Sequence, residues 1–319
     1  MASHAGTARR ILQAVAHIWT KGGYMRNAKR LLLVPVVSLA FAAQASDDCL
    51  KGGEPVICSY EPNAFGFTKE GKRDRGFLDV KMSLAYRLFP EWIQDTWGGD
   101  TEAYLAASVR FGQYLKSDSA PVIGKRFNPK FVVRRLDGES RIDFAYGHES
   151  NGQSINTQAE FDSALSTPKS AEFARDQVSR GWDYLEIEWK KPLGEAGPVT
   201  LYGKFKYFLP NGLFQGRAEE YNAWEMDPEG KPRNQVNGVA AMLKYVRGDA
   251  RRFREIKFFF EYETGYRHIF RYSTFRGEVA AKFMQLPINI WVQNGYGDSL
   301  ALYYKRMSSY GIQVQVGAF

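Results

Sequence analysis

The sequence predicts an all-β fold, a twelve-stranded antiparallel transmembrane β-barrel. Polar and apolar side chains alternate over segments of about ten residues; in residues 256–263 the even positions are apolar and most odd positions are charged. The longest apolar run, residues 31–43, is far shorter than the roughly 20 residues that a membrane-spanning helix needs. A soluble β-sandwich also alternates, but long strands with charges on one face and 15% aromatic residues favour a barrel.

The alternating segments give twelve strands, an even number as bacterial barrels require. They cover residues 58–69, 76–90, 101–116, 126–136, 140–150, 179–191, 198–209, 235–247, 253–264, 271–283, 287–296 and 308–319. Residues 91–100, 137–139, 192–197 and 248–252 are short connections, whereas residues 151–178 and 210–234 are long. We therefore expect the long connections at the extracellular end and the short ones at the periplasmic end.

Residues 1–45 resemble a leader that is removed on export. A basic segment, residues 26–30, precedes the apolar run, and the small residues Ala43 and Ala45 lie at the end of the run, as in a secretory signal peptide cleaved before Ser46. We interpret Met25 as the true start, residues 46–57 as an N-terminal periplasmic segment and residues 58–319 as the barrel.

Removing this leader also removes most of the net charge. The chain of 319 residues has a formal charge of +8, but residues 1–45 contain six basic and no acidic residues. The body that remains is nearly neutral, which argues against nucleic acid as a partner.

The sequence contains two cysteines, Cys49 and Cys58. Export would place them in an oxidising compartment, where they can form a disulfide that closes a small loop. They have no neighbouring histidines, so a zinc site is not expected.

One polar pair interrupts an apolar strand face. In residues 140–150, His148 and Ser150 share their face with Ile142 and Phe144, the face that points to lipid in a barrel. Asp183 has the matching parity on the following strand. A serine, a histidine base and an acid on one face are the groups of a catalytic triad. The alternative is that Ser150 starts a loop, His148 is an interfacial side chain and Asp183 is a solvated strand-end charge.

At these residues the sequence resembles outer membrane phospholipase A. The resemblance lies in His-Glu-Ser-Asn-Gly at 148–152 with Tyr146 before it, residues 179–183, residues 295–300, and Ser119-x-Pro121 followed by Pro129. It implies a twelve-stranded outer-membrane barrel that hydrolyses the sn-1 and sn-2 acyl esters of glycerophospholipids. Ser150 would be the nucleophile and His148 the general base, with Asp183 at a position where the best-known members carry asparagine.

The resemblance also implies a calcium ion and an active homodimer. The calcium ligands would be the Gln153 carbonyl, the Ser179 hydroxyl and Ser119 of a second subunit, and the Gly152 N–H would serve the oxyanion hole. An acidic ligand found in some members is absent, so Asp162 or Asp176 would have to replace it. Gln113, on an apolar strand face, is a further candidate for a contact across the dimer interface.

Two other classes remain open. Charged inner faces would also suit a porin or a structural barrel, although twelve strands leave little lumen once long side chains fill it. A lipopolysaccharide deacylase would use the same outward-facing triad on another lipid. Within the 155–178 insertion, residues 171–178 predict a short helix that caps the site.

Overall fold

The structure, a computed structural model, describes residues 57–71, 75–88, 90–98, 100–114, 122–166, 171–194, 198–214, 232–250, 253–283 and 286–316. The strands are β1 (Ile57–Cys58), β2 (Asn63–Glu70), β3 (Arg75–Leu88), β4 (Thr101–Tyr114), β5 (Val122–Asp137), β6 (Ser140–Ser150), β7 (Gly181–Leu193), β8 (Val199–Phe208), β9 (Gly238–Ala250), β10 (Phe253–Gly265), β11 (Ser273–Phe283), β12 (Leu286–Gly295) and β13 (Met307–Val316). The helices are α3 (Pro90–Trp97), α4 (Gln158–Leu165), α5 (Ala171–Asp176) and α6 (Arg233–Val236). None of these helices has the length and hydropathy needed to cross a membrane.

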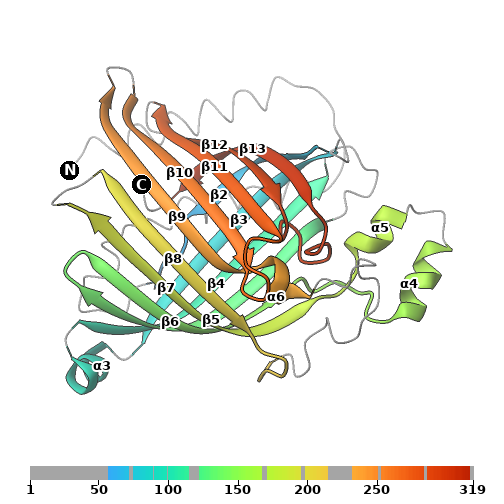
Figure 1. The fold of residues 1–319 in the computed structure, drawn as a ribbon, viewed down its shortest axis with the longest axis horizontal. Coiled ribbons are helices and arrows are strands. Elements are labelled where there is room, and N and C mark those ends of the chain that lie inside the picture. The colour runs from blue at the N-terminus through green and yellow to red at the C-terminus, as the bar shows by residue number, and fades with distance from the viewer. Residues whose placement is uncertain are drawn as a thin grey trace, which may run out of the picture. The chain divides into compact units, whose positions relative to one another are not determined.

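In the described part of the chain, the twelve strands β2–β13 form a closed antiparallel barrel (Figure 1). Each strand pairs with its neighbour in sequence, and β13 returns to pair with β2 from Ser309↔Glu70 to Val316↔Asn63. Closure leaves no open sheet edge, so the backbone N–H and C=O groups of the wall find partners within the wall. The predicted twelve-stranded antiparallel barrel is confirmed.

The first predicted strand, residues 58–69, is interrupted. β1 pairs with β3 at Ile57↔Tyr86, and β2 pairs with the same side of β3 from Ala64 onward. Between them the chain leaves the ladder, and Glu61 N donates to Ser83 Oγ at 3.0 Å. The remaining strands start and end within a few residues of their predicted limits, and β6 matches its prediction at both ends.

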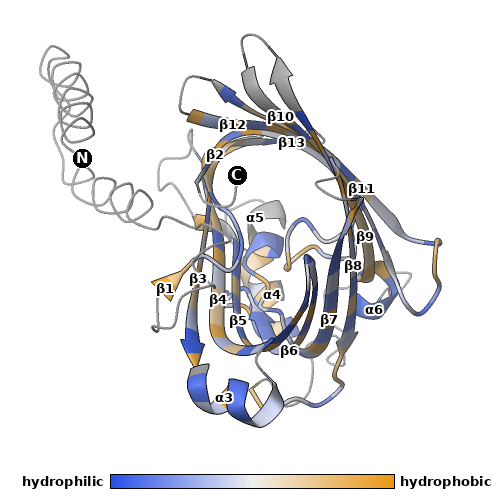
Figure 2. Cartoon of the chain, turned by 90° about the vertical axis from the view of Figure 1, so that its left-hand side faces the viewer, coloured by the Kyte–Doolittle hydropathy of each residue, from blue (hydrophilic) through white to orange (hydrophobic). Residues whose placement is uncertain are grey.

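The outward side chains of the barrel wall are predominantly apolar. On β6, Ile142 and Phe144 are 42% and 50% exposed, whereas the alternate residues Asp143 and Ala145 are buried. The same alternation of hydrophobic and hydrophilic residues runs along the strands in Figure 2. A soluble protein seldom exposes such a continuous apolar surface. The outside of this barrel therefore suits the hydrocarbon of a membrane.

The inward side chains include ion pairs that join neighbouring or more distant strands. Arg134 Nε lies 2.8 Å from Asp143 Oδ1, and Lys130 Nζ lies 2.8 Å from Glu186 Oε1. All four side chains are at most 5% exposed. Each charge thus has a partner of opposite sign, which offsets the cost of removing it from water.

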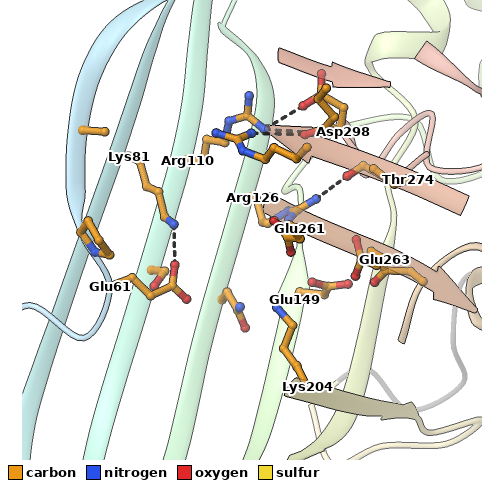
Figure 3. Close-up of a pocket in the computed structure, with 18 of the residues that line it drawn as sticks. Glu61, Lys81, Arg110, Arg126, Glu149, Lys204, Glu261, Glu263, Thr274 and Asp298 are labelled. Atoms are coloured by element: carbon orange, nitrogen blue, oxygen red, sulfur yellow. Dashed lines mark hydrogen bonds and ion pairs between the residues drawn. The ribbon is translucent and has the colours of Figure 1, made fainter. Parts of the chain in front are cut away.

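A polar cavity of about 320 Å³ remains in the lumen (Figure 3). Lys81 Nζ and Glu61 Oε2 are 2.6 Å apart on its wall, and Arg110 contacts Asp298 at 3.1 Å. Lys81 and Arg110 are cross-strand neighbours on β3 and β4, and Figure 3 shows both pairs at the cavity wall. Charged side chains therefore occupy much of the interior, as the small strand number predicts.

The two ends of the barrel are built differently. At the end that carries α4 and α5, residues 300–304 are buried in one apolar cluster with Trp182. At the other end α3 follows β3 (Figure 1), although the sequence predicted only a short connection over residues 91–100. Ile93 of α3 is buried, while Trp92 and Trp97 are exposed. One buried residue in so short a helix gives too little periodicity to be recognised.

Ile187 provides a test of which wall faces lipid. It lies at the middle of β7 and is 42% exposed on the outward face. Replacement by lysine should lower the free energy of unfolding by roughly 2–4 kcal/mol in phospholipid vesicles, because a charge at mid-membrane depth is costly. Chemical denaturation in vesicles measures this loss. Ile187→Ala removes volume without adding charge, so it should cost clearly less; equal losses would contradict a lipid-facing position.

Candidate functional site

Strands β6 and β7 place His148 directly opposite Asp183. The imidazole Nδ1 lies 2.6 Å from Asp183 Oδ1. Both residues have the parity of the exposed Phe144 and Ile187, so both project from the outer face of the wall. This contact leaves the other ring nitrogen of His148, Nε2, for a second partner.

The second carboxylate oxygen of Asp183 accepts two hydrogen bonds. Tyr146 Oη donates to Oδ2 at 2.5 Å, and the backbone N–H of Phe214 donates to it at 2.7 Å. Asp183 is 1% exposed, although it lies on the outer face. Its burial follows from a segment of chain, residues 209–214, that leaves β8 and passes over it. The carboxylate is therefore fully engaged and shielded from water.

Ser150 ends β6, two residues after His148 and on the same outward side. Its cross-strand partners are Phe127 on β5 and Gly181 on β7. Same-side residues two apart on a strand have Cα atoms about 6.6 Å apart, so Ser150 and His148 are neighbouring positions on the outer face. The His148 side chain is largely buried, with 15% of its surface exposed. The three predicted triad residues thus lie together at one height on the outer face.

The backbone after Ser150 is anchored by Asn151. The Asn151 side chain donates to Val178 O at 2.7 Å and accepts from Arg180 N at 2.9 Å. Gly152 follows with φ +55°, a left-handed conformation that glycine adopts without strain. The chain therefore turns sharply next to Ser150 and is tied to the segment that leads into β7.

The same tie brings the two predicted calcium ligands of this chain, Gln153 and Ser179, onto paired segments. Ile155 N donates to Gln177 O at 3.0 Å, and Ser179 N donates to Ile155 O at 2.8 Å. The ligand atoms that these two residues would offer to calcium, a backbone carbonyl oxygen and a hydroxyl oxygen, are both neutral. Calcium accepts such oxygens but usually takes six to eight ligands, including carboxylates. The two residues can thus form part of a calcium shell, and the rest must come from elsewhere.

In the described part of the chain, carboxylates are not gathered at this position. Among the residues that the structure describes, no group of three or more His, Cys, Asp or Glu side chains could hold a metal ion. Asp162 is exposed on α4 and accepts from Gln158 Nε2 at 2.8 Å. Asp176 lines a small cavity together with Asp79 and Asp298. Their substitution for the missing acidic ligand stays a prediction.

Two other predicted site residues, Ser119 and Cys49, lie outside the described residues. The Ser119 calcium ligand therefore stays a prediction. Cys58 is buried, 2% exposed, in a cluster with Ala85 and Tyr104. The disulfide between Cys49 and Cys58 also stays a prediction.

Sequence reasoning did not assign roles to Tyr146 or to residues 209–214. Tyr146 appeared only as part of the motif, and Asn211-Gly212 reads simply as a turn. The hydrogen bond from Phe214 to Asp183 spans 31 residues and is made by a backbone N–H. No side-chain pattern marks such a contact. His268, the other histidine in the described ranges, is exposed in the connection between β10 and β11.

Comparison with solved structures agrees with the predicted resemblance at the level of the fold. The chain is similar to outer membrane phospholipase A from Escherichia coli, with TM-score 0.56 and 14% identity over 84% of this chain and 95% of that one. An active-site mutant of that protein gives TM-score 0.57 and 15% identity, with coverages of 84% and 95%. A calcium-bound dimer of the Salmonella typhi outer membrane phospholipase gives TM-score 0.56 and 14% identity, with coverages of 82% and 92%. No family model and no curated protein sequence matches the chain. The fold is that of an outer-membrane β-barrel.

Asn151 offers a test of the anchor beside the site. Asn151→Ala removes the buried hydrogen bonds to Val178 and Arg180, so residues 151–155 and 178–180 should open more often. Hydrogen–deuterium exchange in these two segments is expected to become roughly ten times faster. Asn156→Ala, which removes an exposed bond to Ser154 O, is the control and should leave both segments unchanged. Equal exchange in the two variants would contradict the anchor.

Proposed function

We propose that this protein is a phospholipase of the bacterial outer membrane that hydrolyses the sn-1 and sn-2 acyl esters of glycerophospholipids. One observation carries the proposal: His148 Nδ1 lies 2.6 Å from Asp183 Oδ1 on the lipid-facing side of the wall, beside Ser150. Polar groups in hydrocarbon destabilise a membrane protein, so a base, an acid and a hydroxyl together on this face indicate a functional role. A lipid ester is the substrate that reaches them there. The likeness to outer membrane phospholipase A supports the same conclusion.

The first half of the reaction forms an acyl-serine. Ser150 Oγ attacks the ester carbonyl carbon while His148 Nε2 accepts the hydroxyl proton. Asp183 accepts from Nδ1–H, which fixes the tautomer with a free Nε2 and stabilises the imidazolium. The imidazolium then donates the proton to the leaving glycerol oxygen, and the lysophospholipid departs.

The second half regenerates the enzyme. Water attacks the acyl-serine carbonyl, and His148 accepts one water proton. The serine oxygen leaves as the tetrahedral intermediate collapses, and His148 returns the proton to it. A fatty acid is released, and each group recovers its starting protonation state. We assign stabilisation of the negative oxygen in both halves to the Gly152 N–H, which lies at a left-handed turn close to Ser150.

We assign Gln153 and Ser179 as calcium ligands, with Ser119 of a second subunit. A bound calcium ion would polarise the ester carbonyl and stabilise the oxyanion. Because Gln153 and Ser179 would contribute only neutral oxygens, one chain alone would hold the ion weakly without further ligands. A partner that supplies Ser119 would therefore make activity depend on dimerisation. Gln113, outward and half-buried on β4, is available for that interface.

Ser150→Ala tests the nucleophile. The variant should lose fatty-acid release from phospholipid by at least about 1000-fold, because the proposed acyl intermediate forms on the Ser150 hydroxyl. Fatty-acid release by His148→Ala should fall by a comparable factor, because the Ser150 hydroxyl then lacks a base. Release is measured in detergent micelles containing calcium. Ser140→Ala is the matched control, because Ser140 begins the same strand with the same parity at its opposite end.

Three outcomes would contradict the proposal in different ways. If the wild type releases no fatty acid, a porin or structural barrel becomes the better account. Release from lipid A alone would identify a lipopolysaccharide deacylase. If Ser150→Ala keeps its activity, Ser150 is not the nucleophile. Buried ion pairs on the inner wall, such as Lys130–Glu186, take up space in the lumen and argue against a wide pore.

Calcium removal gives a separate prediction. A chelator should abolish fatty-acid release by the wild type, and calcium above the chelator concentration should restore it. Ser179→Ala removes one neutral ligand, so it should require roughly tenfold more calcium for half-maximal activity. A calcium titration of activity measures the shift. Full activity in chelator would refute the assigned calcium site and leave the triad untouched.

A further inference from the structure

We propose that Tyr146 and residues 209–214, called the strap below, form a positioning device that requires a carboxylate at position 183. The proposal rests on the proposed roles of His148 and Asp183 and extends them. Tyr146 would act as a positioning residue, because it contacts Asp183 and has no assigned contact with substrate. An amide at position 183 would then fail in this chain.

The strap is tied to Asp183 at both ends. At its start, Leu209 N donates to the backbone carbonyl of Asp183 at 2.9 Å. At its end, Phe214 N donates to Asp183 Oδ2 at 2.7 Å, and Leu213 N donates to Tyr146 Oη at 2.8 Å. The tyrosine hydroxyl thus accepts from the strap and directs its own proton to Oδ2 at 2.5 Å. Strap, tyrosine and carboxylate form one connected network.

The middle of the strap lies directly on the carboxylate. A Cβ atom built on Gly212 would come within 2.0 Å of Asp183 Oδ2 and 2.3 Å of Cγ. Only glycine leaves room for this approach. The strap therefore accounts for the 1% exposure of Asp183, and water is excluded as a replacement partner.

The network presents donors to Oδ2. A backbone N–H donates and does not accept, so the atom facing Phe214 N must be an acceptor. In Asp183→Asn, an NH₂ group in the position of Oδ2 would face the backbone N–H of Phe214. Two hydrogen-bond donors would then point at each other in a site without water, which is costly. A carboxylate satisfies the strap and His148 at once.

The opposite orientation of the asparagine amide, with its oxygen toward Phe214 N, is unfavourable at His148. It would point its NH₂ group at His148 Nδ1, which would then have to accept. The ring proton would move to Nε2, the nitrogen that must take the Ser150 proton. Neither orientation of asparagine therefore keeps both the strap and a competent histidine. The surroundings of Asp183 thus match the departure of this chain from the asparagine of the best-known phospholipases.

Three variants test the device. Asp183→Asn should lower kcat by about 100-fold or more, because the base is held in the wrong tautomer. Tyr146→Phe removes one donor to the carboxylate and should lower kcat about tenfold, with KM for micellar phospholipid unchanged. Gly212→Ala should give a similar loss by lifting the strap without removing any polar group. Rates are measured in micelles with calcium, on barrels whose folding is verified by heat-modifiable migration in SDS gels.

Matched controls separate this effect from general damage. Tyr310→Phe removes a hydroxyl from an exposed outward tyrosine on β13. Gly277→Ala adds a Cβ where the nearest atom, Val292 Cγ2, is 3.9 Å away. Both controls should keep wild-type kcat. If Asp183→Asn stays within threefold of wild type, or if Tyr146→Phe and Gly212→Ala behave like the controls, the proposal is overturned.

A spectroscopic readout separates failure of this proposal from failure of the proposed function. The proton between His148 Nδ1 and Asp183 should give a downfield ¹H resonance in ¹⁵N-histidine-labelled protein. It should vanish in Asp183→Asn and shift in Tyr146→Phe and Gly212→Ala, whether or not the protein hydrolyses phospholipid. A wild type that is inactive but shows this pattern would refute the phospholipase and retain the positioning device. A resonance unchanged in all three variants would refute the device alone.

Discussion

Closure of the sheet is the constraint on which the rest of this structure depends. Hydrocarbon offers no hydrogen-bond partners, so the backbone of the wall has to satisfy itself, and the pairing of β13 with β2 achieves this. Closure also fixes the side of every side chain, because successive residues on a strand point to opposite faces. A polar residue of outward parity then cannot turn inward to find a partner. It has to be satisfied on the outer surface by its neighbours.

The candidate site meets this requirement with its own network. His148 bonds to Asp183, and the other oxygen of Asp183 receives Tyr146 Oη and the N–H of Phe214. On the inner face of the wall, buried charged groups are satisfied by ion pairs such as Arg134–Asp143. The two networks lie on opposite sides of one sheet and differ in kind. Opposite charges are paired inside, whereas outside a single carboxylate is surrounded by donors, which leaves one imidazole nitrogen available.

The sequence predicts the barrel well because the pattern that defines each strand lies within a short run of consecutive residues. Alternation over ten residues fixes both the strand and its faces, so β6 was predicted at both ends and His148 was correctly placed on the outer face. Pairing of adjacent strands with matching parity predicted that Asp183 lies near His148. The break between β1 and β2 and the helix α3 were missed, because each involves too few residues to show a period.

The contacts that complete the site join residues that are far apart in the sequence. Leu213 and Phe214 reach Tyr146 and Asp183 through backbone N–H groups, across separations of 67 and 31 residues. Every residue except proline has such a group, so its use leaves no mark in the sequence. What the sequence does show is Asp183, where an amide would be expected from the resemblance. The departure is explained only when the donors around it are known.

Protein covers only part of this site, and the remainder faces the membrane. The strap buries Asp183, but His148 keeps 15% of its side chain exposed, and Phe214 is 72% exposed at a ring distance of 6.0 Å from the imidazole. In a bilayer, acyl chains cover these surfaces and lower the local dielectric. An ion pair between imidazolium and carboxylate is stronger in such surroundings than in water. In the reaction proposed above, the lipid that brings the ester would thus also complete the environment in which His148 acts as a base.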